Sequence, residues 1–163
     1  MSALKTNALQ MTLAEHGFNG LLLGIRRDEH GIRAKERVFS PRDEDFKWNY
    51  KQQTPELWDQ YRTRSDEGAH MRIHPILHWR EIDIWRYIQR EDIPTVPLYF
   101  AKDGKRFRSI GCKTCCSPVE SEADTVEKII AEIEGSKTSE RAGRAQDKEN
   151  AYTMQKLRAL GYM

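Results

Sequence analysis

The feature that most constrains the fold is a short apolar run bounded by glycines, Phe18-Asn-Gly-Leu-Leu-Leu-Gly24. The run is too short for a helix of ordinary length and is typical of a strand buried on both faces of a parallel sheet. Residues 4–16, just before it, have apolar side chains at helical spacing and end at Gly17, a natural helix stop. A helix followed by a buried strand predicts an α/β fold.

The rest of the chain alternates regular and irregular segments. Residues 40–68 mix charged and aromatic side chains with little periodicity, which predicts a long irregular excursion. The later pattern predicts four further features, namely a strand at 71–77, helices at 79–90 and 125–133, and a turn around Asp103-Gly104. Beyond residue 135 the chain is mostly polar, with one helix expected at 149–160.

Composition excludes several classes of protein. The chain has 27 basic and 25 acidic residues and a net charge of +2, so no global field favours nucleic acid or a membrane surface. No apolar stretch is long enough to span a bilayer, and the N-terminus lacks a basic-then-apolar signal pattern. We expect a cytoplasmic protein that binds neither nucleic acid nor membrane.

An arginine cluster begins where the first predicted strand ends, at Arg26, Arg27, Arg33 and Arg37. Guanidinium groups pair bidentately with phosphate or sulfate oxygens, and ligands of open α/β sheets bind beyond the carboxyl ends of the strands. The cluster therefore suits a polyanionic substrate. The alternative is a solvated basic segment whose arginines form ordinary ion pairs with Asp28, Glu29 and Glu36.

The three cysteines lie together at Cys112, Cys115 and Cys116. A zinc or iron–sulfur site normally takes four protein ligands, and only a histidine such as His70, His74 or His78 could complete the set. None of these histidines has a spacing that singles it out, so packed thiols in a turn or a redox pair are the alternatives. We assign the histidines structural roles and no acid–base chemistry.

A second arginine pair lies in the polar segment Thr138-Ser-Glu-Arg-Ala-Gly-Arg144. Arg141 and Arg144 would suit a lid that closes on nucleotide phosphates, whereas composition alone also fits a solvated tail.

These segments together resemble a known family. Gly24-Ile-Arg-Arg-Asp-Glu-His-Gly-Ile-Arg-Ala-Lys-Glu-Arg37 is similar to the Gly-x-Arg-Arg-Asp-Glu-x-x-x-Arg-Ala-Lys-Glu-Arg signature of sulfate adenylyltransferase subunit 2, and the segment 138–144 resembles that family's last signature. Further matches keep the family's order, at Pro55-Glu-Leu-Trp58, residues 75–87, Val96-Pro-Leu-Tyr99, Phe107-Arg108 and Val119-Glu-Ser121. The resemblance covers almost the whole chain.

The resemblance implies a partial PP-loop fold, similar to that of the adenine nucleotide alpha-hydrolases, over residues 1–134, and a mostly irregular, helical C-terminal tail with the arginine lid over 135–163. It implies the reaction of ATP and sulfate to adenosine 5′-phosphosulfate and pyrophosphate, with Mg²⁺ as cofactor and a GTPase large subunit as partner. Arg26, Arg27 and Arg33 would act on phosphate or sulfate oxygens. Nucleotide contacts would come from Gly24, Asp28, Arg37, Arg141 and Arg144. We expect no metal ligands in this chain, and neither zinc nor an iron–sulfur cluster.

Two departures from the family pattern leave alternatives open. The family's opening strand, Ser-Gly-Gly-Lys-Asp-Ser-like loop and helix, which cradle pyrophosphate, do not occur in this sequence, so we expect the C-terminal half of the pattern. Catalysis by this chain alone therefore stays undecided, and a remnant that binds nucleotide or the partner without turnover is one alternative. The segment Ile110–Pro118 also resembles the Ser-Ile-Gly-Cys-x-x-Cys of assimilatory adenylylsulfate reductases, which makes a thiol-dependent reductase the other.

Overall fold

The computed structural model describes residues 3–51, 53–64, 70–111, 116–136 and 140, and its chain divides into two compact units. Of the described residues, the first unit contains those up to Arg26 together with Lys35–Leu77, and the second contains Arg27–Ala34 and those from His78 to Glu140. The predicted helix at 149–160 and the predicted lid segment 138–144, except Glu140, lie outside the described residues. The described elements are helical and extended in both units, which confirms the α/β class.

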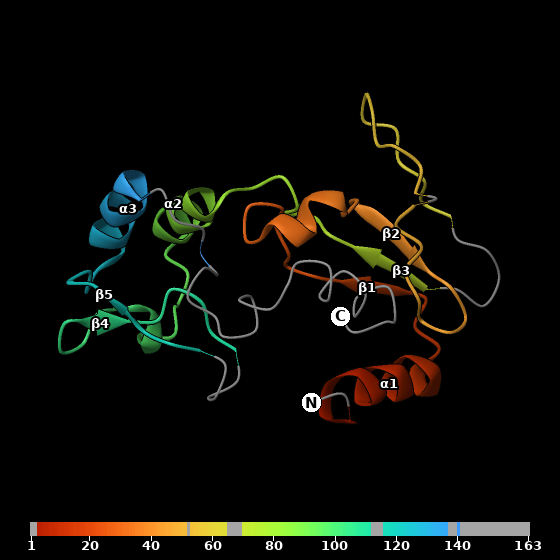
Figure 1. Cartoon of the computed structure of the whole chain (residues 1–163), viewed down its shortest axis with the longest axis horizontal. Helices are drawn as coiled ribbons and strands as arrows, with labels where there is room; N and C mark the ends of the chain where they lie inside the picture. Colours follow the sequence, from red (N-terminus) through yellow and green to blue (C-terminus); the bar gives the residue numbers. More distant parts are fainter. Residues whose placement is uncertain (1–2, 52, 65–69, 112–115, 137–139, 141–163) are drawn as a thin grey trace. The chain divides into compact units, whose positions relative to one another are not determined.

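The first unit is built on a three-stranded sheet in the order β1-β3-β2 (Figure 1). A π-helical turn, η1 (Ala3–Asn7), leads into α1 (Ala8–His16), which ends at Gly17 in the left-handed conformation that glycine adopts without strain. The strands are β1 (Gly20–Leu22), β2 (Phe39–Arg42) and β3 (His70–Ile73). The short helix η2 (Gly31–Lys35) precedes β2 in the chain, but all of its residues except Lys35 belong to the second unit.

Strand β1 pairs with β3 in parallel, as predicted, but β1 is not the strand buried on both faces. Leu22 is 70% exposed, and Leu21 is only half-buried. The central strand β3 takes that role, since His70, Met71 and Arg72 are all buried on its alternating faces.

Strand β2 corrects the prediction of an irregular segment from residue 40. It pairs antiparallel with β3, with Ser40 opposite Arg72 and Arg42 opposite His70. Pro41 is tolerated because an edge strand does not need every backbone N–H for the sheet. The apolar pattern of the sequence does not indicate this strand, because its buried side chains, Ser40 and Arg42, are polar.

The side chain of Glu56 completes the outer edge at the start of β2. Its carboxylate accepts hydrogen bonds from the backbone N–H groups of Val38, at 2.8 Å, and Phe39, at 2.9 Å. The carboxylate thus accepts the hydrogen bonds that a neighbouring strand would otherwise accept. This contact gives a structural reason for the Pro55-Glu-Leu-Trp58 match.

The second unit packs two helices against a small hairpin. Helix α2 (Glu81–Glu91) lies beside α3 (Val126–Gly135), as Figure 1 shows, and η3 (Pro97–Tyr99) precedes the two-stranded sheet of β4 (Lys105–Arg106) and β5 (Val119–Glu120). Trp85, Ala123 and Ile129 form its core. The predicted helices at 79–90 and 125–133 and the turn at Asp103-Gly104, both at positive φ, are confirmed.

Replacing Glu56 with alanine should destabilise the first unit. The change leaves two backbone donors without their charged acceptor, and charge-assisted hydrogen bonds of this kind contribute roughly 2 kcal/mol. Urea unfolding should therefore show a lower unfolding free energy for Glu56→Ala. The matched control is Glu44→Ala, an exposed carboxylate; an equal loss in both variants would refute the role of Glu56.

Acid should destabilise the protein through His70. Burial, and then the positive charges of Arg72 and Arg42, lower the pKa of His70 from 6.5 to about 4. Below pH 6.5 the unfolded chain therefore binds a proton at His70, whereas the folded chain binds it only near pH 4. The contribution of neutral His70 to the free energy of unfolding is complete above pH 6.5. It falls by up to ~3 kcal/mol between pH 6.5 and about pH 4.

The measurement is the free energy of unfolding in urea as a function of pH. His70→Gln should flatten the acid slope, whereas His16→Gln, which changes an exposed histidine, should leave it unchanged. A His70→Gln protein with the wild-type slope would show that another group carries the acid sensitivity.

Candidate functional site

The candidate site of the first unit lies at the carboxyl ends of β1 and β3. Parallel pairing brings these ends to one edge of the sheet, where the Leu23 N–H donates to the Ile73 carbonyl at 2.9 Å. Beyond that bond, a Cβ at Gly24 would meet the Ile76 side chain at 3.8 Å, an ordinary contact. Packing therefore does not require glycine at position 24, and close approach of a ligand to its backbone stays a prediction.

Of the predicted arginines, Arg26 and Arg37 belong to the first unit, whereas Arg27 and Arg33 belong to the second, and their surroundings differ. Arg26 is buried, and Arg27 is half-buried. Arg33 is buried and pairs with Glu29 at 2.5 Å, one turn away along the chain. The alternative of an exposed basic segment with solvated ion pairs does not describe Arg33, because both partners of its ion pair are shielded from water.

Arg37 is held by its backbone more than by its side chain. The ring Nδ1 of His74 lies 2.7 Å from the Arg37 carbonyl oxygen, and the Nδ1–H tautomer donates to it. Burial lowers the pKa of His74, and the nearby charge of Glu36 opposes that shift. The neutral ring agrees with the structural role predicted for this histidine. The Arg37 Nε donates to the Thr54 carbonyl at 3.3 Å.

A buried polar face on β2 and β3 was not foreseen as part of the site. Arg42, Arg72 and His70 are each at most 5% exposed, and Arg42 also lies 5.2 Å from the Trp48 ring. Within the described part of the chain, the Nε2 atoms of His70 and His74 are buried without a hydrogen-bond partner. The signal was available in the sequence, because His70, Arg72 and His74 alternate along a strand and so share one face.

In the second unit, Asp28 has a structural partner. Its carboxylate accepts a hydrogen bond of 2.6 Å from the backbone N–H of Glu81, the first residue of α2. A carboxylate at this place satisfies one of the free N–H groups of the helix start and interacts favourably with the helix dipole. The contact fixes the residue next to Arg27, whatever further part Asp28 takes in binding a nucleotide.

Several predicted site residues lie outside the described part of the chain, namely Cys112, Cys115, Arg141 and Arg144. Cys116 is half-buried, and its Sγ accepts a hydrogen bond from the Gly111 N–H at 2.7 Å. Among the described residues, no group of three or more histidine, cysteine, aspartate or glutamate side chains is placed to hold a metal ion. Nor is any described helix long and apolar enough to cross a membrane.

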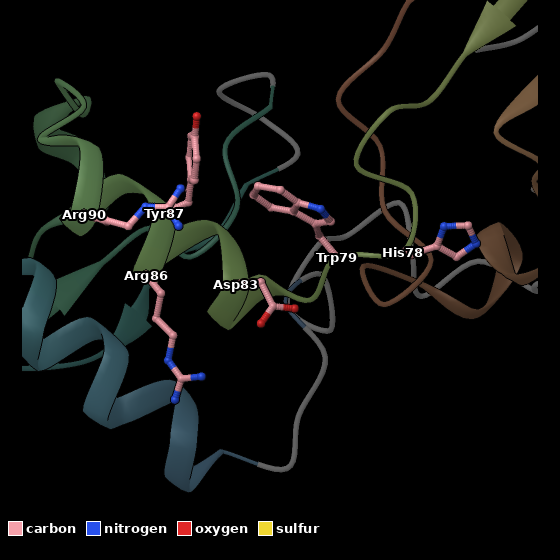
Figure 2. Close-up of a pocket in the computed structure, with 6 residues that line it drawn as sticks. All are labelled: His78, Trp79, Asp83, Arg86, Tyr87 and Arg90. Atoms are coloured by element: carbon pink, nitrogen blue, oxygen red, sulfur yellow. The ribbon is translucent and has the colours of Figure 1, made fainter. Parts of the chain in front are cut away.

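An open pocket of about 450 Å³ lies along the solvent side of α2 (Figure 2). It is lined by His78, Trp79, Asp83, Arg86, Tyr87 and Arg90. Its basic side chains are paired, since Arg86 contacts Glu134 at 2.7 Å and Arg90 contacts Glu91 at 2.7 Å. None of the predicted site residues lines this pocket, and its paired charges make it a poor site for a polyanion.

Comparison with known proteins relates the sequence to sulfur metabolism. A sequence model of the phosphoadenosine phosphosulfate reductase domain matches residues 1–118. The chain is 42% identical to sulfate adenylyltransferase subunit 2 of Saccharophagus degradans, an alignment that covers 98% of this chain and 62% of that protein. The subunit 2 proteins of Maricaulis maris and Rhizobium meliloti are 39% and 41% identical, again over 98% of this chain and over 62% and 59% of their own lengths.

The chain thus spans about three fifths of the length of these curated relatives. The matched domain includes the arginine-bearing segment, the carboxyl edge of the first unit and α2. We conclude that the chain belongs to the phosphoadenosine phosphosulfate reductase domain family.

Proposed function

We propose that this chain provides the sulfate-activating part of a sulfate adenylyltransferase of the subunit 2 type, within a partial PP-loop fold. A sulfate oxygen attacks the α-phosphorus of ATP, the bond from that phosphorus to the bridging oxygen of the β-phosphate breaks, and pyrophosphate leaves with the electron pair. The products are adenosine 5′-phosphosulfate and pyrophosphate. The proposal rests mainly on one observation, the run of arginines that begins at the carboxyl edge of the parallel pair.

Electrostatics explains why arginines suit this reaction. Sulfate is a poor nucleophile and approaches an already anionic phosphate, so the barrier contains a large repulsive contribution that fixed positive charges reduce. Buried guanidinium groups act most strongly, because little water screens them. We assign this neutralising role to Arg26, Arg27 and Arg33, and nucleotide contacts to Gly24, Asp28 and Arg37.

The remaining assignments follow from the family. Arg141 and Arg144 would close over the nucleotide as a lid, and the tail from residue 135 would form a part separate from residues 1–134. The described residues of the site suit anions better than a directly bound metal, because Asp28 and Glu29 already have partners. We therefore expect Mg²⁺ to come with the ATP phosphates.

The names of the relatives include the word subunit, and this supports a heteromer. We propose that the partner is a large subunit that hydrolyses GTP, since release of pyrophosphate from ATP does not by itself make the mixed anhydride of phosphate and sulfate favourable. The direct test is sulfate-dependent exchange between ATP and labelled pyrophosphate, with the partner subunit present. If the chain binds ATP but no such exchange occurs, the chain is a nucleotide-binding remnant without turnover.

Replacing Arg27 with alanine should lower the sulfate-dependent exchange roughly 100-fold, the size of effect seen when one charge-stabilising donor is removed from an active site. The fold should survive, because Arg27 is only half-buried. Circular dichroism and urea unfolding check the fold. Arg90→Ala is the matched control, since it removes an exposed arginine of the second unit; equal activity of Arg27→Ala and wild type would refute the site.

A further inference from the structure

One buried ion pair joins two of the segments that the family resemblance singled out. The Arg108 guanidinium faces the Glu81 carboxylate as a fork, with Nε to Oε1 at 2.9 Å and Nη2 to Oε2 at 2.6 Å. The two side chains are 11% and 9% exposed. Contact with Glu81 is the largest cause of a raised pKa for Arg108, which keeps the guanidinium charged.

The same residue, Glu81, also contacts the segment that carries the predicted anion-binding arginines. Its backbone N–H donates to the Asp28 carboxylate at 2.6 Å, and Asp28 follows Arg27 directly in the chain. The ion pair fixes the side chain of Glu81 while Asp28 binds its main chain. The orientation of the helix start is thus transmitted to the backbone beside Arg27.

Arg108 connects this arrangement to the end of α3 as well. Its Nη1 lies 3.3 Å from the Ser136 hydroxyl oxygen, and Ser136 is the residue that caps α3. The predicted lid follows at residues 138–144, and the cysteine segment begins a few residues after Arg108. A single guanidinium therefore contacts the beginning of one helix and the end of the other.

We propose that Glu81 and Arg108 are positioning residues that hold the backbone of Arg27–Ala34 in the geometry needed to bind a phosphate or sulfate group. This inference rests on the proposed function for its choice of ligand. Neither residue touches the substrate; both act through Asp28. The positioning concerns the second unit alone, in which all of these contacts lie.

Helix packing alone does not account for this pair. Trp85 and Ile129 already form an apolar core between α2 and α3, and Arg86 and Glu134 link the same helices at 2.7 Å with both side chains 52% exposed. A buried ion pair costs more desolvation than an exposed one, and apolar side chains of similar size often stabilise a fold equally well. What the buried fork adds is a fixed orientation.

The test separates stability from orientation. In the variant that carries Glu81→Met together with Arg108→Met, the charges are removed as a pair, so no single buried charge is left behind and folding is retained. We expect hydrogen–deuterium exchange of the amides of residues 27–34 to become about 10-fold faster than in wild type. Binding of sulfate and of ATP, measured by calorimetry, should weaken about 10-fold.

Two further variants complete the design. Arg86→Met is the matched control, because it removes an arginine that links the same helices from an exposed position, and it should alter neither the exchange of residues 27–34 nor the affinity. Arg108→Lys keeps the charge but loses the fork, and it should show an intermediate exchange rate. Keeping the positive charge without the fork is therefore expected to restore only part of the protection from hydrogen exchange.

Each outcome decides a different point. Wild-type exchange in residues 27–34 of the folded double variant would overturn the positioning role, whatever the activity. Faster exchange with unchanged affinity would overturn the link to anion binding. A wild-type chain that binds neither sulfate nor ATP would refute the proposed function, while the exchange data would still show whether Glu81 and Arg108 hold the segment.

Discussion

The parallel pairing of β1 with β3 is the constraint on which the rest of the first unit depends. It brings the carboxyl ends of both strands to one edge, so that the chain leaves β1 toward the arginines and leaves β3 toward His74. His74 then holds the Arg37 carbonyl, and its own N–H donates to the Val38 carbonyl at 2.8 Å. The residue after β3 therefore sets the path of the backbone that enters β2.

Burial of charged side chains is the second organising principle, and the two units achieve it in different ways. In the first unit, the buried Arg42 guanidinium donates to the Ser40 hydroxyl at 2.7 Å and lies 5.2 Å from the Trp48 ring. In the second unit, Arg106 is 1% exposed and pairs with Glu132 at 2.6 Å, while Glu132 also binds the Ser121 hydroxyl. The first arrangement places a guanidinium beside a hydroxyl and an aromatic ring, whereas the second pairs it with a carboxylate.

Sequence reasoning succeeded where apolar periodicity decides the structure and failed where polar side chains are buried. Trp85 lies on a clear helical stripe, and Asp103-Gly104 can adopt the positive φ that a tight turn requires, so both were predictable. Strand β2 has no such signal, because its buried residues are Ser40 and Arg42 and its edge is completed by Glu56 from a distant segment. The arginine positions could be predicted from their order after a strand; the partners that fix them, Glu81 and Arg108, depend on contacts distant in sequence.

The pocket on α2 shows why concavity alone does not identify the site. Its aromatic walls, Trp79 and Tyr87, contact each other edge-to-face at 5.3 Å, and the side chain of Arg90 lies over the Tyr87 ring. The capping carboxylate Asp83 accepts the Arg80 backbone N–H, which is the first cause of its lowered pKa. These groups satisfy one another and leave little net charge for a ligand. In the segment around Arg27, the Asp28 carboxylate accepts the backbone N–H of Glu81, and Glu29 pairs with Arg33.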